Sequence, residues 1–580
     1  MDRDANPAVI GKLGGDMKRF LALTAVAMVG AATLAHAQPP GGGGNSQPYT
    51  WREDQLDPSP VGAATDPIDT NLWIGDYRNA TPRTAYGALV FRDILTGLDG
   101  ADRLHPPRRG AVLETMKAIS QAALAPGATA KGRAPAGDRQ VYYVVGGAGA
   151  ITVNGKTHAL KEGVGFTLTP DFEFTLTNTG KASLTMYVRA ELLPGDYKPS
   201  PDIVVVDRFD NDRRVGAHWA HICNGGPNGM NLCTIAPRTI PQQHSHPNEE
   251  VWLAVKGESI LSLGKDTRKM IPGQAYRIPP TGLVAHSNIN LGEEPIQLIY
   301  MGIAARPSNP PQPPSGRDFA RLDGSPFKIN GEVDVDMYSG AWRDAFPRIV
   351  HGNLYFRDML TALQGPDALH PTRKGAVLTS ADAVSHAMLE PNAWAHPIDG
   401  ELKGLQQTFI VNSGAGYITQ GDKRFELSKD KAFVITPGMN FRMTATGSKY
   451  LTFYVVTEKV PGGATPSTTL NVVDRSKAAQ TTSRWYNKER SLITKADGLV
   501  QFPSIDQVEL GPMKIAQSRS AAKDVEEIWI ATEGGGDMLF GKYLRRFPEG
   551  SAIRVPPTGI SAQGNFNFTD KPTRYLHLIR

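Results

Sequence analysis

Residues 242–257 read QQHSHPNEEVWLAVKG, and this stretch decides the fold we expect for the chain. His244 and His246 alternate along a segment that has the character of a β-strand, so both imidazoles point to one face. Glu250 lies four residues after His246 and has the same parity. A glycine, Gly257, ends the run. The stretch therefore predicts a strand that presents two imidazoles and one carboxylate on the same side.

A second stretch, residues 272–290, reads PGQAYRIPPTGLVAHSNIN and completes the pattern. The Pro-Pro-Thr-Gly run at 279–282 predicts a turn, and His286 follows on the next strand. Three imidazoles and one carboxylate are a suitable ligand set for a divalent first-row metal. The alternative is a set of polar residues on a solvated strand face. Agreement among ligand types, parity and turn positions favours the metal site.

The two stretches resemble the paired motifs of the cupin superfamily. The first motif is HxH, three residues, Glu, six residues and Gly, and it is matched by His244, His246, Glu250 and Gly257. The second motif is matched with one extra residue on each side of its central glycine, by Gly273, Pro279, Gly282, His286 and Asn290. The resemblance implies a small antiparallel β-barrel with a metal inside its mouth.

Internal repeats extend this prediction to the whole chain. FRDILTGLDGADRLHPPRRGAVL at 91–113 recurs as FRDMLTALQGPDALHPTRKGAVL at 356–378, an offset of 265 residues. EEVWLAVKG at 249–257 recurs as EEIWIATEG at 526–534, an offset of 277 residues. Repeats at a fixed spacing indicate duplicated structural units. We predict an all-β protein of four tandem, jelly-roll-like cupin barrels arranged as two duplicated bicupin halves.

The repeats and the composition shifts between them divide the chain into seven parts. We expect a signal peptide at 1–37, an N-terminal arm and tether at 38–85, a degenerate cupin barrel at 86–200, the metal-binding barrel at 201–306, a Pro-rich linker at 307–330, and two further degenerate barrels at 331–462 and 463–580.

The N-terminus has the features of an export signal. Lys18 and Arg19 precede an apolar run at 20–34, and Ala-His-Ala at 35–37 has the form of a cleavage site. Translation from Met1 or from Met17, and an uncleaved anchor in place of a cleaved signal, remain open. No later stretch reaches 18 apolar residues, so we expect no membrane span and a periplasmic or secreted protein.

Charge and cysteine content narrow the function classes. The net charge is +5 over 580 residues and no basic block is present, so we expect no nucleic-acid partner. Cys223 and Cys233 are the only cysteines, separated by a turn-rich segment. Two alternatives are open for this pair: a disulfide, which export to an oxidising compartment would allow, or two thiols packed in the core.

Only one of the four barrels keeps the ligand set. In the fourth barrel the positions of His244, His246 and His286 carry Ala521, Lys523 and Gln563. The first and third barrels place Gln140 and Gln407 at the glutamate position. Because a metal needs several suitable ligands, we predict one divalent transition metal per chain. Fe²⁺ or Mn²⁺ is favoured, and Zn²⁺, Ni²⁺ or Cu²⁺ would also be accepted.

Four further side chains are expected to contact substrate. Strand parity directs Gln242 and Trp252 into the barrel, and places Asn288 beside the fourth ligand. Either Tyr276 or its neighbour Arg277 is expected to reach in, and Tyr276 is our candidate. Trp252 is also explained as a core aromatic, because Trp529 recurs in a barrel without ligands. The candidate catalytic residues are Gln242, Trp252, Tyr276 and Asn288.

The cupin resemblance implies an exported metal-dependent enzyme, and we expect a mononuclear dioxygenase acting on a small aromatic or enolic substrate. One alternative is a metal-dependent lyase or decarboxylase of a small organic acid. Another is a non-catalytic periplasmic binding or storage-type cupin, since three barrels lack ligands. The expected partner is a small, anionic molecule, and the possibility of a homo-oligomer is left open. A fold alone does not choose among these functions.

Overall fold

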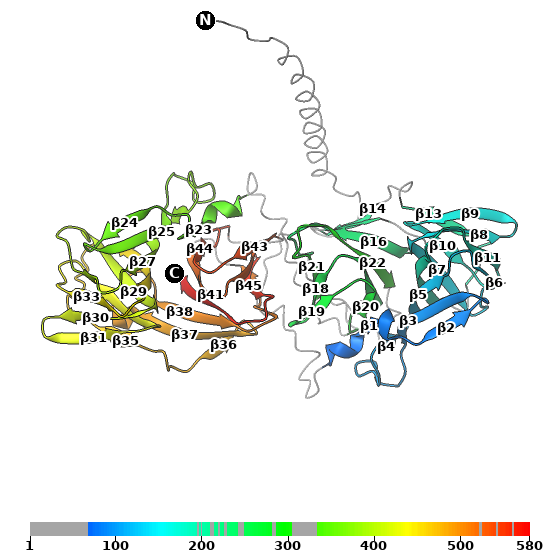
Figure 1. The fold of residues 1–580 in the computed structure, drawn as a ribbon, viewed down its shortest axis with the longest axis horizontal. Coiled ribbons are helices and arrows are strands. Elements are labelled where there is room, and N and C mark those ends of the chain that lie inside the picture. The colour runs from blue at the N-terminus through cyan, green and yellow to red at the C-terminus, as the bar shows by residue number, and fades with distance from the viewer. Residues whose placement is uncertain are drawn as a thin grey trace, which may run out of the picture. The chain divides into compact units, whose positions relative to one another are not determined.

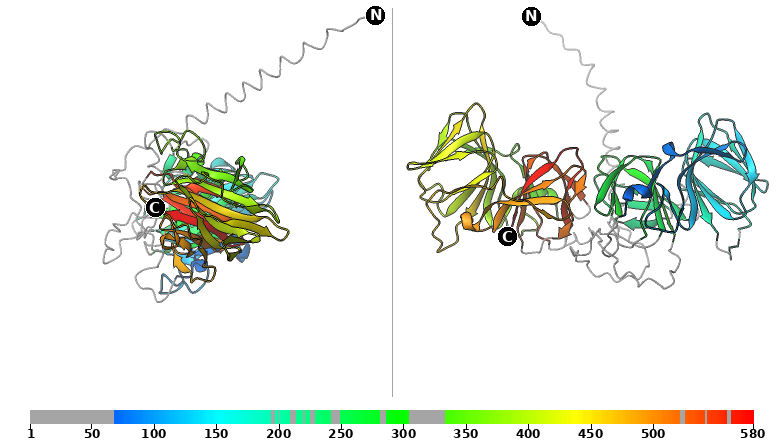
Figure 2. Two further views of the ribbon diagram at one scale, coloured as in Figure 1. Left: turned by 90° about the vertical axis from the view of Figure 1, so that its left-hand side faces the viewer. Right: turned by 90° about the horizontal axis from the view of Figure 1, so that it is seen from below.

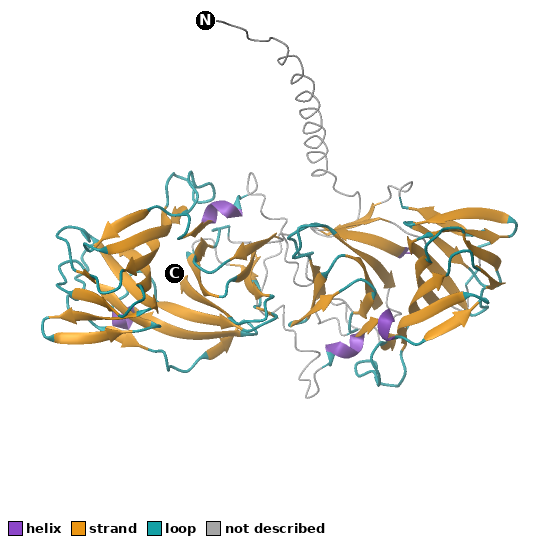
Figure 3. Ribbon diagram, in the orientation of Figure 1, coloured by secondary structure: helices purple, strands orange, loops and turns teal. Residues whose placement is uncertain are grey.

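The computed structural model describes residues 68–193, 197–198, 200–208, 214–218, 221–224, 229–241, 249–280, 286–303, 333–520, 525–540, 543–558 and 562–580. This part of the chain is built from β-strands, with only short 3₁₀ turns of helix (Figure 3). These turns are η2 (Thr70–Trp73), η3 (Tyr77–Asn79), η6 (Val335–Tyr338) and η7 (Lys495–Asp497). The predicted all-β fold of four barrels in two repeated halves is confirmed.

The first barrel consists of two facing sheets. One contains, in order, β13 (Val204–Asp207), β10 (Val164–Leu168), β7 (Asp138–Gly146), β12 (Leu184–Leu192), β5 (Met116–Leu124), β3 (Leu89–Gly97) and β2 (Pro82–Ala85), with β4 (Ala111–Leu113) beside β3. The other contains β6 (Thr129–Arg133), β11 (Glu173–Asn178), β8 (Ala148–Val153) and β9 (Lys156–Lys161). Buried residues alternate with partly or fully exposed ones along β8 and β11, as expected for strands that cover a core on one face.

The second barrel has the same plan (Figure 1). Its larger sheet contains β1 (Ile74–Asp76), β20 (Gln274–Arg277), β17 (Glu249–Lys256), β22 (Ile296–Ile303), β16 (Met230–Ile235), β15 (His221–Asn224) and β14 (Arg214–His218). Its smaller sheet contains β19 (Asp266–Met270), β18 (Ser259–Leu263) and β21 (His286–Ile289).

The third barrel repeats the first. Its larger sheet contains β24 (Pro347–Val350), β25 (Leu354–Ala362), β27 (Ala381–Leu389), β34 (Leu451–Lys459), β29 (Leu405–Ser413), β32 (Lys431–Ile435) and β35 (Val472–Asp474), with β26 (Ala376–Leu378) beside β25. Its smaller sheet contains β28 (Trp394–Ala395), β33 (Arg442–Thr446), β30 (Ala415–Gln420) and β31 (Lys423–Leu427).

The fourth barrel repeats the second. Its larger sheet contains β23 (Ser339–Ala341), β44 (Ser551–Arg554), β41 (Glu527–Glu533), β46 (Thr573–Ile579), β38 (Ser504–Leu510), β37 (Asn487–Thr494) and β36 (Thr481–Ser483). Its smaller sheet contains β39 (Lys514–Ile515), β45 (Ala562–Asn567), β42 (Gly536–Phe540) and β43 (Tyr543–Phe547), with β40 (Arg519–Ser520) beside β45. Figure 2 shows the strand layers of these barrels from two further directions.

Short strands cross the boundaries drawn from the sequence. β1 lies in the segment that we assigned to the N-terminal arm, yet it pairs with β20 of the second barrel. β13 follows the expected start of the second barrel at 201, yet it pairs with β10 of the first. β23 and β35 make the corresponding exchanges in the second half. Each strand occupies a sheet edge whose backbone groups would otherwise lack partners, so the two barrels of a half complete each other.

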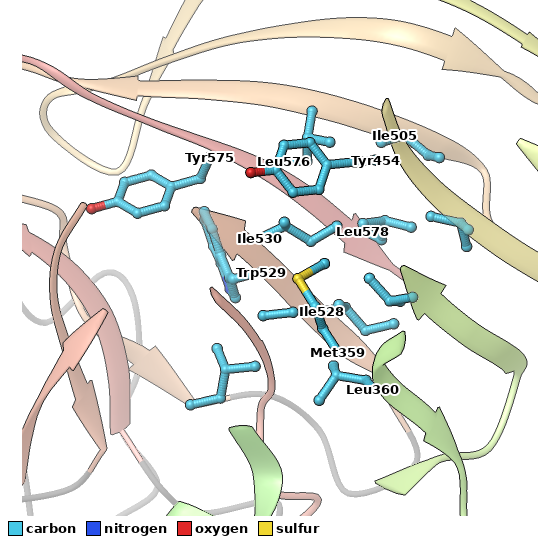
Figure 4. Close-up of a cluster of buried hydrophobic side chains, with 14 of the residues drawn as sticks. Met359, Leu360, Tyr454, Ile505, Ile528, Trp529, Ile530, Tyr575, Leu576 and Leu578 are labelled. Carbon is cyan, nitrogen blue, oxygen red and sulfur yellow. The ribbon is translucent and has the colours of Figure 1, made fainter. Parts of the chain in front are cut away.

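Packing also joins the two barrels of each half. One cluster in the first half combines Ile119 and Val141 of the first barrel with Leu253 and Ile299 of the second. In the second half, Met359, Leu360 and Tyr454 of the third barrel meet Ile528 and Ile530 of the fourth (Figure 4). A core continuous between two barrels makes each half one packing unit.

The two cysteines lie opposite each other on neighbouring strands. Cys223 on β15 pairs in register with Cys233 on β16, and Cys233 is disulfide-bonded. The structure therefore selects the disulfide from the two alternatives that the sequence left open. Within the described ranges, no helix has the length and apolar character to cross a membrane.

Candidate metal centre

Strand β17 carries two adjacent glutamates whose side chains face opposite ways. Both Glu249 and Glu250 are buried. The Glu249 carboxylate accepts hydrogen bonds from the backbone nitrogens of Glu114, at 3.0 Å, and Thr115, at 2.7 Å, and from the Thr115 hydroxyl, at 2.6 Å. It therefore holds the second barrel against the first. Strand alternation directs Glu250 to the other face, the interior of its own barrel.

Glu250 meets His286 inside the second barrel. The His286 Nε2 lies 3.2 Å from the Glu250 Oε1, and both residues are almost fully buried. The Trp252 indole N–H donates to the same carboxylate oxygen. β17 and β21 thus bring together one carboxylate and one imidazole from residues 36 apart in the chain. This is the donor chemistry that a divalent first-row metal accepts.

The structure also decides which of Tyr276 and Arg277 reaches into the barrel. Asn288 donates its side-chain amide to the Tyr276 hydroxyl at 2.8 Å, and both residues are buried. Arg277 points the other way, toward the Val112 carbonyl and the Glu114 carboxylate, which is 2.5 Å away. Tyr276 and Asn288 therefore lie inside the barrel as predicted, and Arg277 belongs to the contact between the two barrels.

Three of the sequence-predicted residues lie outside the described residues. These are Gln242, His244 and His246. The structure brings together the remaining five, which are Glu250, Trp252, Tyr276, His286 and Asn288. Among the described residues, then, half of the proposed ligand set is present and its two members are adjacent.

The described part of the barrel wall around this pair is aromatic and largely buried. Trp252, Tyr276 and Ile278 belong to one buried cluster, and Tyr300 packs against it. Burial raises the pKa of the Tyr276 hydroxyl well above 10.0, and the nearby Glu250 charge acts in the same direction. Both causes also raise the pKa of Tyr300. The two phenols are therefore neutral groups that can donate hydrogen bonds.

The equivalent carboxylate in the fourth barrel is neutralised by protein groups. Glu527 accepts hydrogen bonds from the Trp529 indole at 2.9 Å, the Gln563 amide at 3.0 Å and the Arg519 guanidinium at 2.8 Å. The His577 Nε2 is 3.0 Å away. Arg519 occupies the position of Gln242, and Gln563 that of His286. A guanidinium thus supplies the positive charge in this barrel.

The electrostatics of Glu527 agree with this arrangement. Burial by itself would raise the pKa of this carboxyl. The hydrogen bond and charge of His577, with the charges of Arg519 and Arg484, outweigh burial and lower the pKa from 4.5 to about 2. Glu527 is therefore an ionised group with a full set of partners.

The first and third barrels have no carboxylate at this position. Gln140 accepts hydrogen bonds from the hydroxyls of Tyr86, at 3.1 Å, and Tyr142, at 2.7 Å. Gln407 lies 2.8 Å from the His351 Nε2. Each glutamine is paired with neighbouring side chains.

Three residues that contribute to these sites or support them were not predicted from the sequence. Glu249 is a buried contact between barrels, Arg519 is the internal cation of the fourth barrel, and Tyr300 lies in the wall of the second. Pairing residues at the 277-residue offset would have found them. It aligns Glu249 with Glu526, Gln242 with Arg519, and Tyr300 with His577.

One family model and several solved structures are similar to parts of this chain. Residues 231–302 match the family described as "Cupin domain". No curated protein matches the chain. Among solved structures, protein Ylba from E. coli is 14% identical, with a TM-score of 0.32, covering 43% of this chain and 96% of that one.

Two other solved structures are similar to this chain to a comparable degree. Bacillus subtilis oxalate decarboxylase is 13% identical, with a TM-score of 0.31, covering 40% of this chain and 78% of that one. Momordica charantia 7S globulin is 12% identical, with a TM-score of 0.32, covering 41% and 85%. At such identities these likenesses carry no conclusion about function. The match to the family described as "Cupin domain" spans the part of the chain that contains Glu250, Trp252 and His286.

Proposed function

We propose that the second barrel holds one divalent transition metal through His244, His246, Glu250 and His286, and that the chain is an exported metal-dependent dioxygenase of small aromatic or enolic substrates. The observation that supports the metal site is the buried Glu250–His286 pair, with 3.2 Å between carboxylate oxygen and ring nitrogen. The metal is favoured to be Fe²⁺ or Mn²⁺. Export to the periplasm or the medium is part of the proposal and rests on residues 1–37.

The second and fourth barrels differ in a way that fits a metal. In the fourth barrel, Arg519 and Gln563 donate to the carboxylate. At the equivalent positions the second barrel carries Gln242 and His286, a neutral amide and an imidazole. A buried carboxylate needs compensating positive charge. Two further imidazoles at 244 and 246 suit a metal ion as the source of that charge.

The residues around the pair have defined tasks in this proposal. A divalent metal with an open position supplies Lewis acidity, and Fe²⁺ or Mn²⁺ also supplies access to O₂ chemistry. Trp252 orients Glu250 through its indole N–H. Asn288 fixes the Tyr276 hydroxyl. The aromatic wall excludes water and offers flat apolar surfaces to an organic substrate.

Metal analysis tests the first part of the proposal. We expect elemental analysis of the purified or reconstituted chain to find close to one transition metal per chain. His244→Ala should remove it, because one of four ligands is lost. Lys523→Ala, at the equivalent of His246 in the fourth barrel, is the control and should leave the metal bound. Equal loss from both variants, or no metal even after reconstitution, would contradict the proposed centre.

Oxygen consumption tests the second part. We expect O₂ uptake in step with product formation when the loaded protein is supplied with catechols or flavonols. Turnover under strict anaerobiosis would exclude a dioxygenase and favour the lyase or decarboxylase alternative. Stable metal binding with no turnover across an untargeted substrate screen would favour a binding or storage protein.

A further inference from the structure

Tyr300 lies in the wall of the second barrel, next to the side chain that orients Glu250. It sits on β22, directly opposite Trp252 on β17. The two rings are 5.0 Å apart between centroids and tilted by 52°. Unlike Trp252, which is buried, Tyr300 is half-buried. Part of the Tyr300 side chain is therefore accessible, whereas the Trp252 ring is enclosed.

Gly302 shows where the phenol hydroxyl lies. On β22, Gly302 is directly opposite Glu250, two residues beyond Tyr300. A Cβ atom added at Gly302 would overlap the Tyr300 hydroxyl oxygen. The phenol therefore extends along its strand over Gly302, to the level of Glu250. Since residues two apart share a strand face, both lie on the interior side.

The fourth barrel shows independently that this strand position is directed at the carboxylate. His577 is the equivalent of Tyr300, and it reaches Glu527 with 3.0 Å between Nε2 and Oε1. Its ring stacks on Trp529 with centroids 4.0 Å apart. The residue opposite Glu527 is Ile579, where the second barrel has a glycine. Each barrel therefore directs a polar side chain toward its strand glutamate. The second barrel does so with Tyr300, which extends over Gly302. The fourth does so with His577, and there Ile579 stands in place of the glycine.

The two polar groups have different partners. His577 is engaged with Glu527. The Tyr300 hydroxyl makes no hydrogen bond to any residue in the described part of the chain. A neutral phenol at the level of a metal ligand is a donor suited to an anionic oxygen.

We propose that the Tyr300 hydroxyl donates a hydrogen bond to an anionic oxygen of the substrate bound beside Glu250, and that Gly302 provides the space for it. Tyr300 is then a binding residue that selects substrates with a carboxylate, enolate or phenolate oxygen. This inference rests on the metal centre proposed above.

The test uses the full chain loaded with Co²⁺ and titrated with 4-nitrocatechol, a chromophoric phenolate. Tyr300→Phe removes only the hydroxyl, and we expect the dissociation constant of 4-nitrocatechol to rise about tenfold. Gly302→Ala should weaken the probe similarly, because the added methyl displaces the hydroxyl. Co²⁺ affinity, measured by competition with a chelator, should stay within about twofold of the wild type. Tyr575→Phe removes a phenol hydroxyl in the fourth barrel and is the control for folding and loading.

Three outcomes would overturn the inference. If Tyr300→Phe binds 4-nitrocatechol as tightly as the wild type, the hydroxyl does not contact the probe. If Tyr300→Phe loses Co²⁺ and the probe together, Tyr300 supports the ligands and not the substrate. If the wild type itself fails to bind Co²⁺, the proposed metal centre fails first, and the inference fails with it.

Discussion

The indole nitrogen of Trp252 determines how the Glu250 carboxylate is presented inside the second barrel. The two side chains are two residues apart on β17, and the N–H donates to Oε1. Trp529 makes the same contact to Glu527 at 2.9 Å. From the sequence, the recurrence of this tryptophan in a barrel without the ligand set favoured a packing role for Trp252. The structure shows that the indole both packs and donates, so the two interpretations do not exclude each other.

Trp252→Phe should therefore weaken metal binding while keeping most of the packing. Losing a hydrogen bond that orients a ligand typically lowers metal affinity by roughly tenfold to a hundredfold. Chelator competition with Co²⁺ or Mn²⁺ measures this change in metal affinity. Trp529→Phe removes the same bond in the fourth barrel and should leave metal affinity unchanged. Unchanged metal affinity in both variants would mean that Trp252 contributes only to core packing.

Glu527 should contribute pH-dependent stability. Its pKa in the folded protein is about 2, below the ordinary 4.5. The contribution is therefore fully present above pH 4.5 and is lost as the pH falls toward 2. We expect Glu527→Gln to lower the unfolding free energy at neutral pH by about 3 kcal/mol, with a difference from the wild type that shrinks between pH 4.5 and 2.

Denaturant unfolding across this pH range measures the effect. Glu258→Gln is the control, because Glu258 is exposed and pairs only with the exposed Lys269. That pair should contribute less than about 1 kcal/mol at any pH. A pH-independent difference for Glu527→Gln would mean that the carboxyl is not ionised in the folded protein.

At the scale of elements, strand β17 serves two purposes at once. One face presents Glu250 to the barrel interior, and the other presents Glu249 to the backbone nitrogens of Glu114 and Thr115. The arrangement recurs at the start of β41, where Glu526, the residue before the strand, accepts from the backbone nitrogens of Thr379 and Ser380 at 2.8 and 2.6 Å. The adjacent glutamates therefore couple the site strand to the neighbouring barrel.

Glu249→Gln and Glu250→Gln should separate these two purposes. An amide at 249 replaces one acceptor oxygen with a donor that faces other donors, which should cost about 2 to 3 kcal/mol and lower the unfolding temperature. Metal affinity should fall much less than in Glu250→Gln, which loses a ligand. Calorimetry and chelator competition on the same samples check both effects. Loss of metal in Glu249→Gln equal to that in Glu250→Gln would contradict the separation.

The sequence predicted regular features better than it predicted pairing partners. The resemblance of residues 242–290 to the cupin motifs, extended by the repeats, was sufficient to predict four barrels. The predicted boundaries put β1 in the N-terminal arm and β13 in the second barrel, whereas β1 pairs with the second barrel and β13 with the first. A segment of three or four residues has too short a hydrophobic pattern to predict which distant strand it pairs with. Parity required one of Tyr276 and Arg277 to point inward, but it could not choose between them across the 279–282 turn. Tyr300 lies outside both motifs, so only its alignment with His577 marks it.

At the scale of the whole molecule, the packing unit is a pair of barrels. β1 from residues 74–76 completes the sheet that contains β17, and the first barrel covers the outer face of that sheet. A fragment of residues 201–306 would lack both. It would expose the unpaired edge of β20 and a face that includes Val251 and Leu253.

We therefore expect residues 201–306 alone to be insoluble or unfolded, and residues 68–306 to fold. Soluble expression and a cooperative thermal transition by circular dichroism distinguish the two fragments. A folded 201–306 fragment with full metal affinity would show that the site needs no support from the first barrel.

The network around Glu527 also bears on how this chain can change over evolutionary time. Arg519, Gln563, Trp529 and His577 all converge on a carboxylate with no exposed surface. Replacing Arg519, Gln563 or His577 by an apolar residue leaves that charge with fewer partners. Single substitutions at Arg519, Gln563 or His577 are therefore expected to be destabilising, which would make these positions slow to change.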